Sequence, residues 1–195
     1  HKMILEAKER LSKDGALSKG MNNHIYYGLH HDAQGNWVFR EWAPNATKIY
    51  LIGDFNNWKR SDAYALSPVG GGNWEISLPA MFLDHGTLYK LYIEWKGGGA
   101  ERLPAYVTRA VQDPHTKTFC AQVWDPFQPY EWKNEKPGKR PHPLIYECHI
   151  GMAQEEGKVG SYREFKDNIL PRIRDLGYNT IQIMAIMEHP YYGSF

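Results

Sequence analysis

The segment from Leu144 to Phe195 reads as a strand, a helix and a second strand. Ser161 followed by Glu164 is a capping box, in which each side chain bonds an amide of the first helical turn. Gly177 is placed to end the helix in the left-handed conformation. Two parallel strands joined by a crossover helix need further strands beside them and cover on both faces. The segment therefore predicts the first layer of a larger parallel sheet rather than a complete domain.

The helix of this segment has one apolar stripe. Its members recur at three- and four-residue spacing and are Tyr162, Phe165, Ile169, Ile173 and Leu176. Pro171 lies inside the stripe, where it removes one backbone hydrogen bond and should kink the helix without ending it. Residues Thr180 to Met187 are nearly all apolar, which is typical of a strand buried on both faces.

The middle of the chain, from His24 to about Trp124, alternates short aromatic and β-branched runs with turn signals. Trp74, Ile76 and Leu78 share one face of a predicted strand, and a later strand shows the same alternation around Leu91. This pattern predicts an immunoglobulin-like antiparallel β-sandwich of about 100 residues. A helix from Met3 to about Leu17, with Gly15 as a terminator, is expected before it.

The chain of 195 residues is thus mainly β and divides into four expected parts. They are a helical segment (1–23), the sandwich (24–125), a Pro-rich linker (126–143) that can hold neither helix nor central strand, and the incomplete β-α-β layer (144–195). A formal net charge of +1 gives no sign of nucleic-acid binding. No apolar run reaches membrane-spanning length.

The polar residues that often carry chemistry give little signal here. The two cysteines, Cys120 and Cys148, lack metal-ligand spacing and suit reduced thiols in a cytoplasmic protein, so the sequon at Asn45 is expected to be unused. We find no spacing for a zinc site, no phosphate loop and no nucleophile elbow, and we expect neither a metal nor a cofactor.

Exposed aromatic residues are more informative. Trp42 is expected where a strand runs into a proline turn, and Trp58 ends the turn that begins at Gly53. An indole at such a position can stack on the apolar face of a sugar ring. Lys90, on the wet face of its strand, could bond a sugar hydroxyl. The competing interpretation is that tryptophans fill the core, which composition favours for at least half of the seven.

Several motifs together resemble the eukaryotic-type 1,4-α-glucan branching enzymes. The resemblance covers essentially the whole chain and is most specific in its last 50 or so residues. It lies in the motifs Arg40-Glu41-Trp42-Ala43-Pro44, Gly53-Asp54-Phe55-Asn56-Asn57-Trp58, Tyr146-Glu147-Cys148-His149-Ile150-Gly151, Ser161-Tyr162-Arg163-Glu164-Phe165 and the residues from Met184 to Phe195.

The resemblance implies a family 48 carbohydrate-binding module joined to the start of an α-amylase-type TIM (β/α)8 barrel of glycoside hydrolase family 13. The parent would cleave an α-1,4 link and re-attach the segment as an α-1,6 branch, retaining configuration through a carboxylate nucleophile and an acid/base. In the family these carboxylates lie on later strands, so no catalytic residue is expected in this chain.

The resemblance also implies a glucan-binding surface. Its residues would be Trp42 and Pro44, the loop Gly71, Gly72 and Asn73, and Lys13 and Asp14 near the end of the preceding helix. Three glycines stand in this loop where the family often has aromatic and charged residues. The expected partners are an α-1,4-glucan, the C-terminal barrel of the parent and, through open strand edges, a second copy of the chain.

Two other functions remain open on the sequence. One is a non-catalytic glycan-binding module that targets a partner to polysaccharide, which the β-α-β segment argues against. The other is a debranching or other α-amylase-type hydrolase, which would share the sandwich but not the residues Tyr191 to Phe195.

Overall fold

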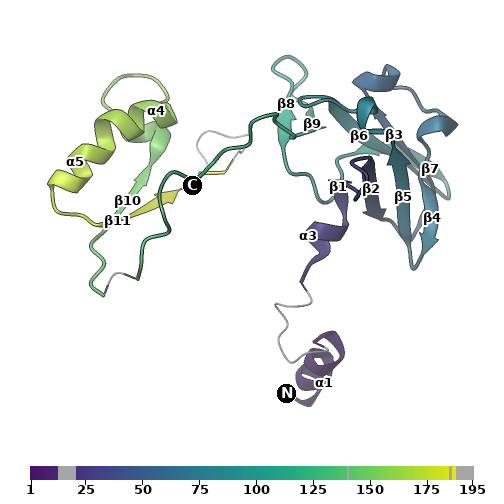
Figure 1. Cartoon of the computed structure of the whole chain (residues 1–195), viewed down its shortest axis with the longest axis horizontal. Helices are drawn as coiled ribbons and strands as arrows, with labels where there is room; N and C mark the ends of the chain where they lie inside the picture. Colours follow the sequence, from purple (N-terminus) through teal and green to yellow (C-terminus); the bar gives the residue numbers. More distant parts are fainter. Residues whose placement is uncertain (13–20, 140, 185, 188–195) are drawn as a thin grey trace. The chain divides into compact units, whose positions relative to one another are not determined.

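The computed structural model describes residues 1–12, 21–139, 141–184 and 186–187. The chain forms two compact units, His1–Tyr130 and Glu131–Phe195. Figure 1 shows the strands of the first unit and the short strand pair with its helix in the second.

The first unit contains two antiparallel sheets that pack face to face. The first sheet has the order β1-β2-β5-β4, with β1 at Gly28–His31, β2 at Trp37–Trp42, β5 at Asn73–Leu78 and β4 at Ser67–Gly70. The second has the order β3-β6-β9-β8, with β7 also paired to β6; these are β3 at Ala46–Gly53, β6 at Leu88–Trp95, β7 at Gly98–Arg102, β8 at Ala110–Gln112 and β9 at Phe119–Gln122.

Side chains from both sheets form one apolar core. Phe39 comes from the first sheet and Ile49, Leu51 and Leu91 from the second, and all are fully buried. The alternation predicted from the sequence is confirmed, since Trp74 and Leu78 point into this core while Glu75 and Ser77 do not. The prediction of a mainly β, immunoglobulin-like sandwich is therefore confirmed.

Short helical segments also occur along the first unit. They are α1 at Lys2–Leu11, α3 at Asn23–Tyr26 and the 3-10 turns η1 at Asp54–Asn56, η2 at Asp62–Tyr64 and η3 at Ala80–Phe82. The expected helix to Leu17 is wrong in its end, because α1 stops at Leu11 and both the backbone and the hydroxyl of Ser12 bond the Lys8 carbonyl. The predicted terminator Gly15 lies outside the described residues. No helix among those described is both long and apolar enough to cross a membrane.

The second unit is a parallel strand pair with one helical crossover. Its elements are β10 at Ile145–His149, η4 at Ile150–Met152, α4 at Tyr162–Glu164, the π-helical η5 at Phe165–Ile169, α5 at Leu170–Asp175 and β11 at Thr180–Met184. The capping box is confirmed, because Ser161 accepts from the Glu164 amide and Glu164 accepts from the Ser161 amide. Gly177 has φ +90° and ends the helix as predicted.

Pro171 does not end the helix, and the sequence analysis had predicted that the helix would continue past it. The residues before it, Phe165–Ile169, form a π-helical turn, and the helix continues through Leu170–Asp175. In an α-helical turn the proline ring would press against the carbonyl four residues earlier. Proline also has no N–H with which to bond that carbonyl. The wider π-helical turn gives the ring more room at this point.

The apolar stripe and the second strand are shorter than predicted. Phe165 and Ile173 are buried, but Tyr162 is 60% and Leu176 73% exposed. The 3, 5 and 6 residues of α4, η5 and α5 make fourteen helical residues, which span about 21 Å, whereas a five-residue strand spans only about 17 Å, so the ends of the helix extend past the sheet.

The strand β11 stops at Met184 rather than Met187, and Ile186 and Met187 are exposed. Burial on both faces is also wrong for the described residues, because the one helix covers a single face and leaves Glu147 and Gln182 on the other. Between β9 and β10 the described residues form neither helix nor strand.

Candidate functional site

The candidate glucan site lies where β2 and β5 end side by side. Trp42 on β2 is directly opposite Asn73 on β5. Both side chains are on the outer face of the sheet, since their neighbours Glu41 and Trp74 point inward. Trp42 is 56% exposed, and its indole nitrogen donates to the Gly71 carbonyl at 3.1 Å. One edge of the ring is therefore fixed while a large part of the ring stays open to solvent.

The glycine loop packs tightly on the Trp42-Ala43-Pro44 turn. The Ala43 amide donates to the Gly72 carbonyl at 2.8 Å. A Cβ on Gly72 would lie 2.8 Å from the Pro44 Cβ and 3.0 Å from the Trp42 indole nitrogen, and Gly72 has φ +83°. Glycine is thus required at this position by space and by backbone conformation. The loop approaches the turn by its backbone, without the larger side chains common in the family that the sequence resembles.

Asn73 is held by two hydrogen bonds. Its Oδ1 accepts from the Tyr27 hydroxyl at 2.6 Å, and its Nδ2 donates to the Gly70 carbonyl at 3.0 Å. The amide is therefore fixed in orientation beside the indole of Trp42. Tyr27 was not among the residues selected from the sequence, because it is 46 residues away in the chain.

A buried carboxylate lies directly under this surface. Glu41 is only 5% exposed; its Oε1 accepts from the Trp42 amide at 3.0 Å and its Oε2 from the Ala105 amide at 2.9 Å. Burial raises the pKa of Glu41, and the two amide bonds act in the opposite direction. Alternation along β2 points Glu41 inward if Trp42 points outward. This was the sequence signal that could have predicted the buried carboxylate, and the sequence reasoning missed it.

Trp58 and Lys90 lie apart from Trp42, on the second sheet and its adjoining turn. Trp58 donates to Asp54 Oδ1 at 3.2 Å, and the Lys90 ammonium lies 5.8 Å from the centre of the indole ring. Lys90 also pairs with Glu101 at 2.9 Å. Both line a groove of about 470 Å³, with Asp54, Leu88, Val111, Gln112, Asp113, Pro114, Thr116, Thr118 and Cys120. The selected residues therefore form two surfaces rather than one.

Lys13 and Asp14, the remaining selected residues, lie outside the described part of the chain.

Of the seven tryptophans only Trp37 and Trp74 are buried in the core, so the expectation that at least half would be core is wrong. Cys120 and Cys148 are free, and burial raises the pKa of both thiols. Within the described residues no group of three or more His, Cys, Asp or Glu is placed to hold a metal ion.

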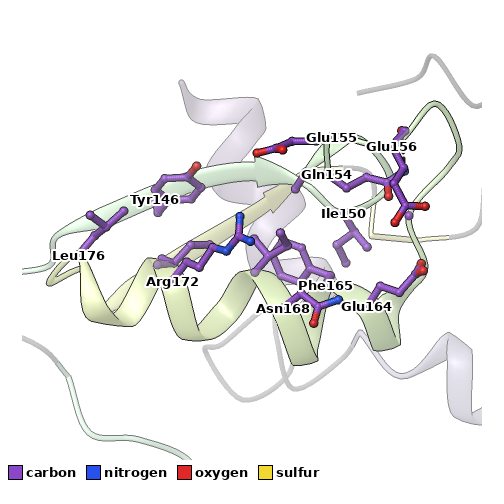
Figure 2. Close-up of a pocket in the computed structure, with 14 residues that line it drawn as sticks. Tyr146, Ile150, Gln154, Glu155, Glu156, Glu164, Phe165, Asn168, Arg172 and Leu176 are labelled. Carbon is purple, nitrogen blue, oxygen red and sulfur yellow. Dashed lines mark hydrogen bonds between the residues drawn. The ribbon is translucent and has the colours of Figure 1, made fainter.

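The second unit has a separate hollow of about 510 Å³ between β10, the loop that follows it and the helix. Figure 2 shows Ile150 and Phe165 in this hollow, with Glu155 and Glu156 on the loop and Glu164 on the helix. Bonds from Lys158 and Ser161 lower the pKa of Glu164 to about 2. A carboxyl group that stays ionised and holds a helix cap is unsuited to act as a general acid.

Comparison with known proteins adds to this geometry. The family model for Carbohydrate-binding module 48 (Isoamylase N-terminal domain) matches residues 26–115, which include Trp42, Asn73, Trp58 and Lys90. This part of the chain is thus similar to that family. The match covers the strands of the first sheet and most of those of the second.

Curated relatives are similar over nearly the whole chain. The 1,4-alpha-glucan-branching enzyme of Rhizophagus irregularis is 42% identical over 96% of this chain and 28% of its own length. That of Equus caballus is 38% identical over 93% of this chain and 27% of its own. The predicted resemblance to branching enzymes is confirmed, and the chain spans about 28% of the length of such relatives.

Solved structures share the fold at low identity. The pneumococcal glycogen-degrading factor SpuA, in a product complex, has a TM-score of 0.64 at 20% identity, over 84% of this chain and 20% of its own. The GBS pullulanase SAP, in complex with maltotetraose, has a TM-score of 0.64 at 20% identity, over 85% and 24%. At this identity the likeness concerns the fold alone.

Proposed function

We propose that this chain is the glucan-binding N-terminal part of a 1,4-α-glucan branching enzyme. The observation that carries the proposal is the exposed ring of Trp42, fixed opposite Asn73 in a family 48 carbohydrate-binding module. The open face of an indole stacks on the C–H face of a glucose ring, and an adjacent amide bonds the hydroxyls. Gly72, which precedes Asn73, packs closely on Pro44 and on the indole nitrogen of Trp42.

The activity of the whole protein is part of the proposal. The parent would cleave an α-1,4 link and transfer the freed segment to a glucose 6-hydroxyl, in the synthesis of glycogen or starch. Its catalytic carboxylates would lie on barrel strands that follow β11. The β10–β11 layer would then pair with that barrel, and the cytoplasm is the compartment we expect. The boundaries 24–125 for the module and 126–143 for the linker remain predictions.

Affinity electrophoresis tests the binding function. We expect the chain to be slowed in native gels that contain amylose or glycogen, and to run normally in gels that contain dextran, whose α-1,6 backbone presents a different ring spacing. Equal mobility in amylose gels and in gels without polysaccharide, for a chain shown to be folded by circular dichroism, would contradict the proposal.

The groove of Trp58 and Lys90 is a second candidate glucan surface. Trp58 has φ +59°, an unusual backbone conformation for a bulky residue, and its indole is held by Asp54. Unusual backbone conformations of this kind concentrate at binding sites. If both surfaces bind glucan, replacing Trp58 by Ala weakens retardation on amylose gels further when Trp42 is already replaced.

The two alternative functions are less well supported. The parallel pair β10–β11 belongs to a second unit that a targeting module alone has no need for. A debranching or other α-amylase-type hydrolase would share the fold, but curated relatives with 35–42% identity carry the branching-enzyme name.

A further inference from the structure

The hydroxyl of Tyr27 donates to Asn73 Oδ1 at 2.6 Å, directly beside the proposed glucan surface. We propose that Tyr27 is a positioning residue for glucan binding, which acts by fixing the side-chain amide of Asn73. The inference rests on the proposed glucan-binding function of Trp42 and Asn73. It goes beyond that function because Tyr27 would not touch the sugar itself and would act only through Asn73.

An asparagine amide offers two donors and an acceptor oxygen with two lone pairs. In Asn73 one lone pair accepts from Tyr27 and one N–H donates to Gly70. These two bonds decide which edge of the amide is oxygen and which is nitrogen. They leave one N–H on Nδ2 and one lone pair on Oδ1, the two atoms bonded to Cγ, a combination that matches neighbouring hydroxyls of a pyranose, of which one accepts and the other donates.

Tyr27 is itself held in place by aromatic contacts. Its ring stacks on Tyr106, with centroids 5.4 Å apart and planes at 21°, and meets Tyr26 edge to face at 5.0 Å. Burial, with nearby Tyr26, Tyr106 and Glu41, raises the pKa of Tyr27, so its hydroxyl keeps the donated proton at neutral pH. The donor is thus fixed in position and in protonation.

The contacts around Tyr27 also connect it to Trp42. Glu41 bonds the amides of both Trp42 and Ala105, and Ala105 precedes the Tyr106 whose ring stacks on Tyr27. Asn73 then lies opposite Trp42 in the sheet. The backbone of Trp42 and the side-chain amide of Asn73 are therefore linked by one closed series of contacts. The bond from Tyr27 to Asn73 completes this series.

The test measures affinity for maltoheptaose by titration calorimetry on the full chain. Replacing Tyr27 by Phe keeps the ring and removes the hydroxyl, and we expect binding about three- to tenfold weaker, as for one lost hydrogen bond. Tyr26→Phe is the matched control, since it removes a hydroxyl from the neighbouring ring, and should change affinity less than about twofold. A silent Tyr27→Phe in a folded chain would overturn the proposal.

A double-mutant cycle separates positioning from a general structural effect. We expect Tyr27→Phe to weaken binding in the normal chain but to have little effect once Asn73 is replaced by Ala, because both changes remove the same fixed amide. The side-chain amide signals of Asn73 in nitrogen–proton NMR spectra should move in Tyr27→Phe and stay in Tyr26→Phe. An equal loss of affinity in both backgrounds would overturn the proposal.

Two further arms keep the result interpretable. If Tyr27→Phe unfolds, difluorotyrosine placed at position 27 keeps the ring, and affinity should fall as pH rises through the lowered pKa of that phenol; an unchanged affinity there would also overturn the inference. Trp42→Ala is measured in parallel. If it leaves affinity unchanged, the proposed glucan surface itself is wrong, whereas a weakened Trp42→Ala with a silent Tyr27→Phe rejects only the role of Tyr27.

Discussion

Trp42 and Trp74 lie on neighbouring strands of one sheet and point to opposite faces. Trp42 is 56% exposed, whereas Trp74 is 8% exposed and donates its indole N–H to the Ala43 carbonyl at 3.0 Å. From the inner face of the sheet, Trp74 thus stabilises the turn that follows Trp42, whose side chain lies on the outer face. The two indoles should respond differently to substitution, since one is core and the other is surface.

Replacing Trp42 by Ala should weaken binding to linear α-glucans while the sandwich stays folded. Loss of ring stacking is worth about 1 kcal/mol or somewhat more, or roughly five- to tenfold in affinity. Titration calorimetry with maltooligosaccharides, alongside circular dichroism, measures both effects. Trp124→Ala is the matched control, because its side chain is 52% exposed. Unchanged affinity, or unfolding of Trp42→Ala, would place Trp42 outside the site.

Replacing Gly72 by Ala should both destabilise the first unit and weaken glucan binding. The added Cβ would meet Pro44 at 2.8 Å, and Gly72 has φ +83°. Gly70→Ala is the control, because Gly70 has φ +96° but nothing within 4 Å of the new Cβ. Both variants incur about 1 kcal/mol or more from the backbone alone. Urea unfolding should therefore show a larger loss for Gly72→Ala, and equal losses would mean that the contact with Pro44 is unimportant.

The ion pair of Glu164 should make the second unit pH-sensitive. Its pKa is lowered to about 2 by the bond from Lys158 and by the two bonds from Ser161. A lowered pKa in the folded state stabilises the fold above the unfolded value near 4.5, and this contribution disappears as pH falls toward 2.

The matching variant is Glu164→Gln, which cannot ionise. The difference in unfolding midpoint between it and the unaltered chain should be constant above about pH 5 and shrink toward pH 2. Glu156→Gln, which removes another partner of Lys158, serves as the control. A difference that does not change with pH would show that the carboxylate charge is unimportant.

Limited proteolysis should cut first in the linker between the units. Phe127, Lys133 and Lys136 are exposed there, and the described residues from 123 to 144 form no helix or strand. We expect a stable fragment that retains the sandwich, and a lower mass by light scattering after trimming if β10 and β11 cause self-association through their open edges. A monomer whose second unit resists protease as well as the sandwich does would contradict this.

The chain by itself should have no branching or hydrolytic activity, since the catalytic carboxylates of the family it resembles are expected on later barrel strands. Incubation with amylose, followed by the iodine-complex spectrum and by reducing ends, should give values equal to the blank. Turnover that a point substitution within the chain abolishes would show that this expectation is wrong.

Local patterns predicted the fold well because they depend on neighbours in sequence. The alternation around Trp74 and the capping box at Ser161 are both decided within a few residues. The bond from Tyr27 to Asn73 and the bond from Ala105 to Glu41 join residues 46 and 64 positions apart. No periodicity signals such contacts, so the sequence identified the exposed indole but not the network behind it.

The same limit applies to the second unit. The stripe from Tyr162 to Leu176 was predicted at its correct spacing, but how much of it is covered depends on the length of the sheet beneath. The π-helical turn before Pro171 likewise depends on how a whole helix accommodates one missing donor.

The bond from the Trp42 indole to the Gly71 carbonyl affects how sugars can be told apart. It occupies the single polar atom of the indole, so the open face of the ring offers only apolar contact. Such a face accepts glucose and its epimers almost equally well, because each presents a patch of C–H groups. Stereochemical discrimination at this surface would therefore depend on the amide of Asn73, and a substitution there would broaden the range of polysaccharides bound before it abolished binding.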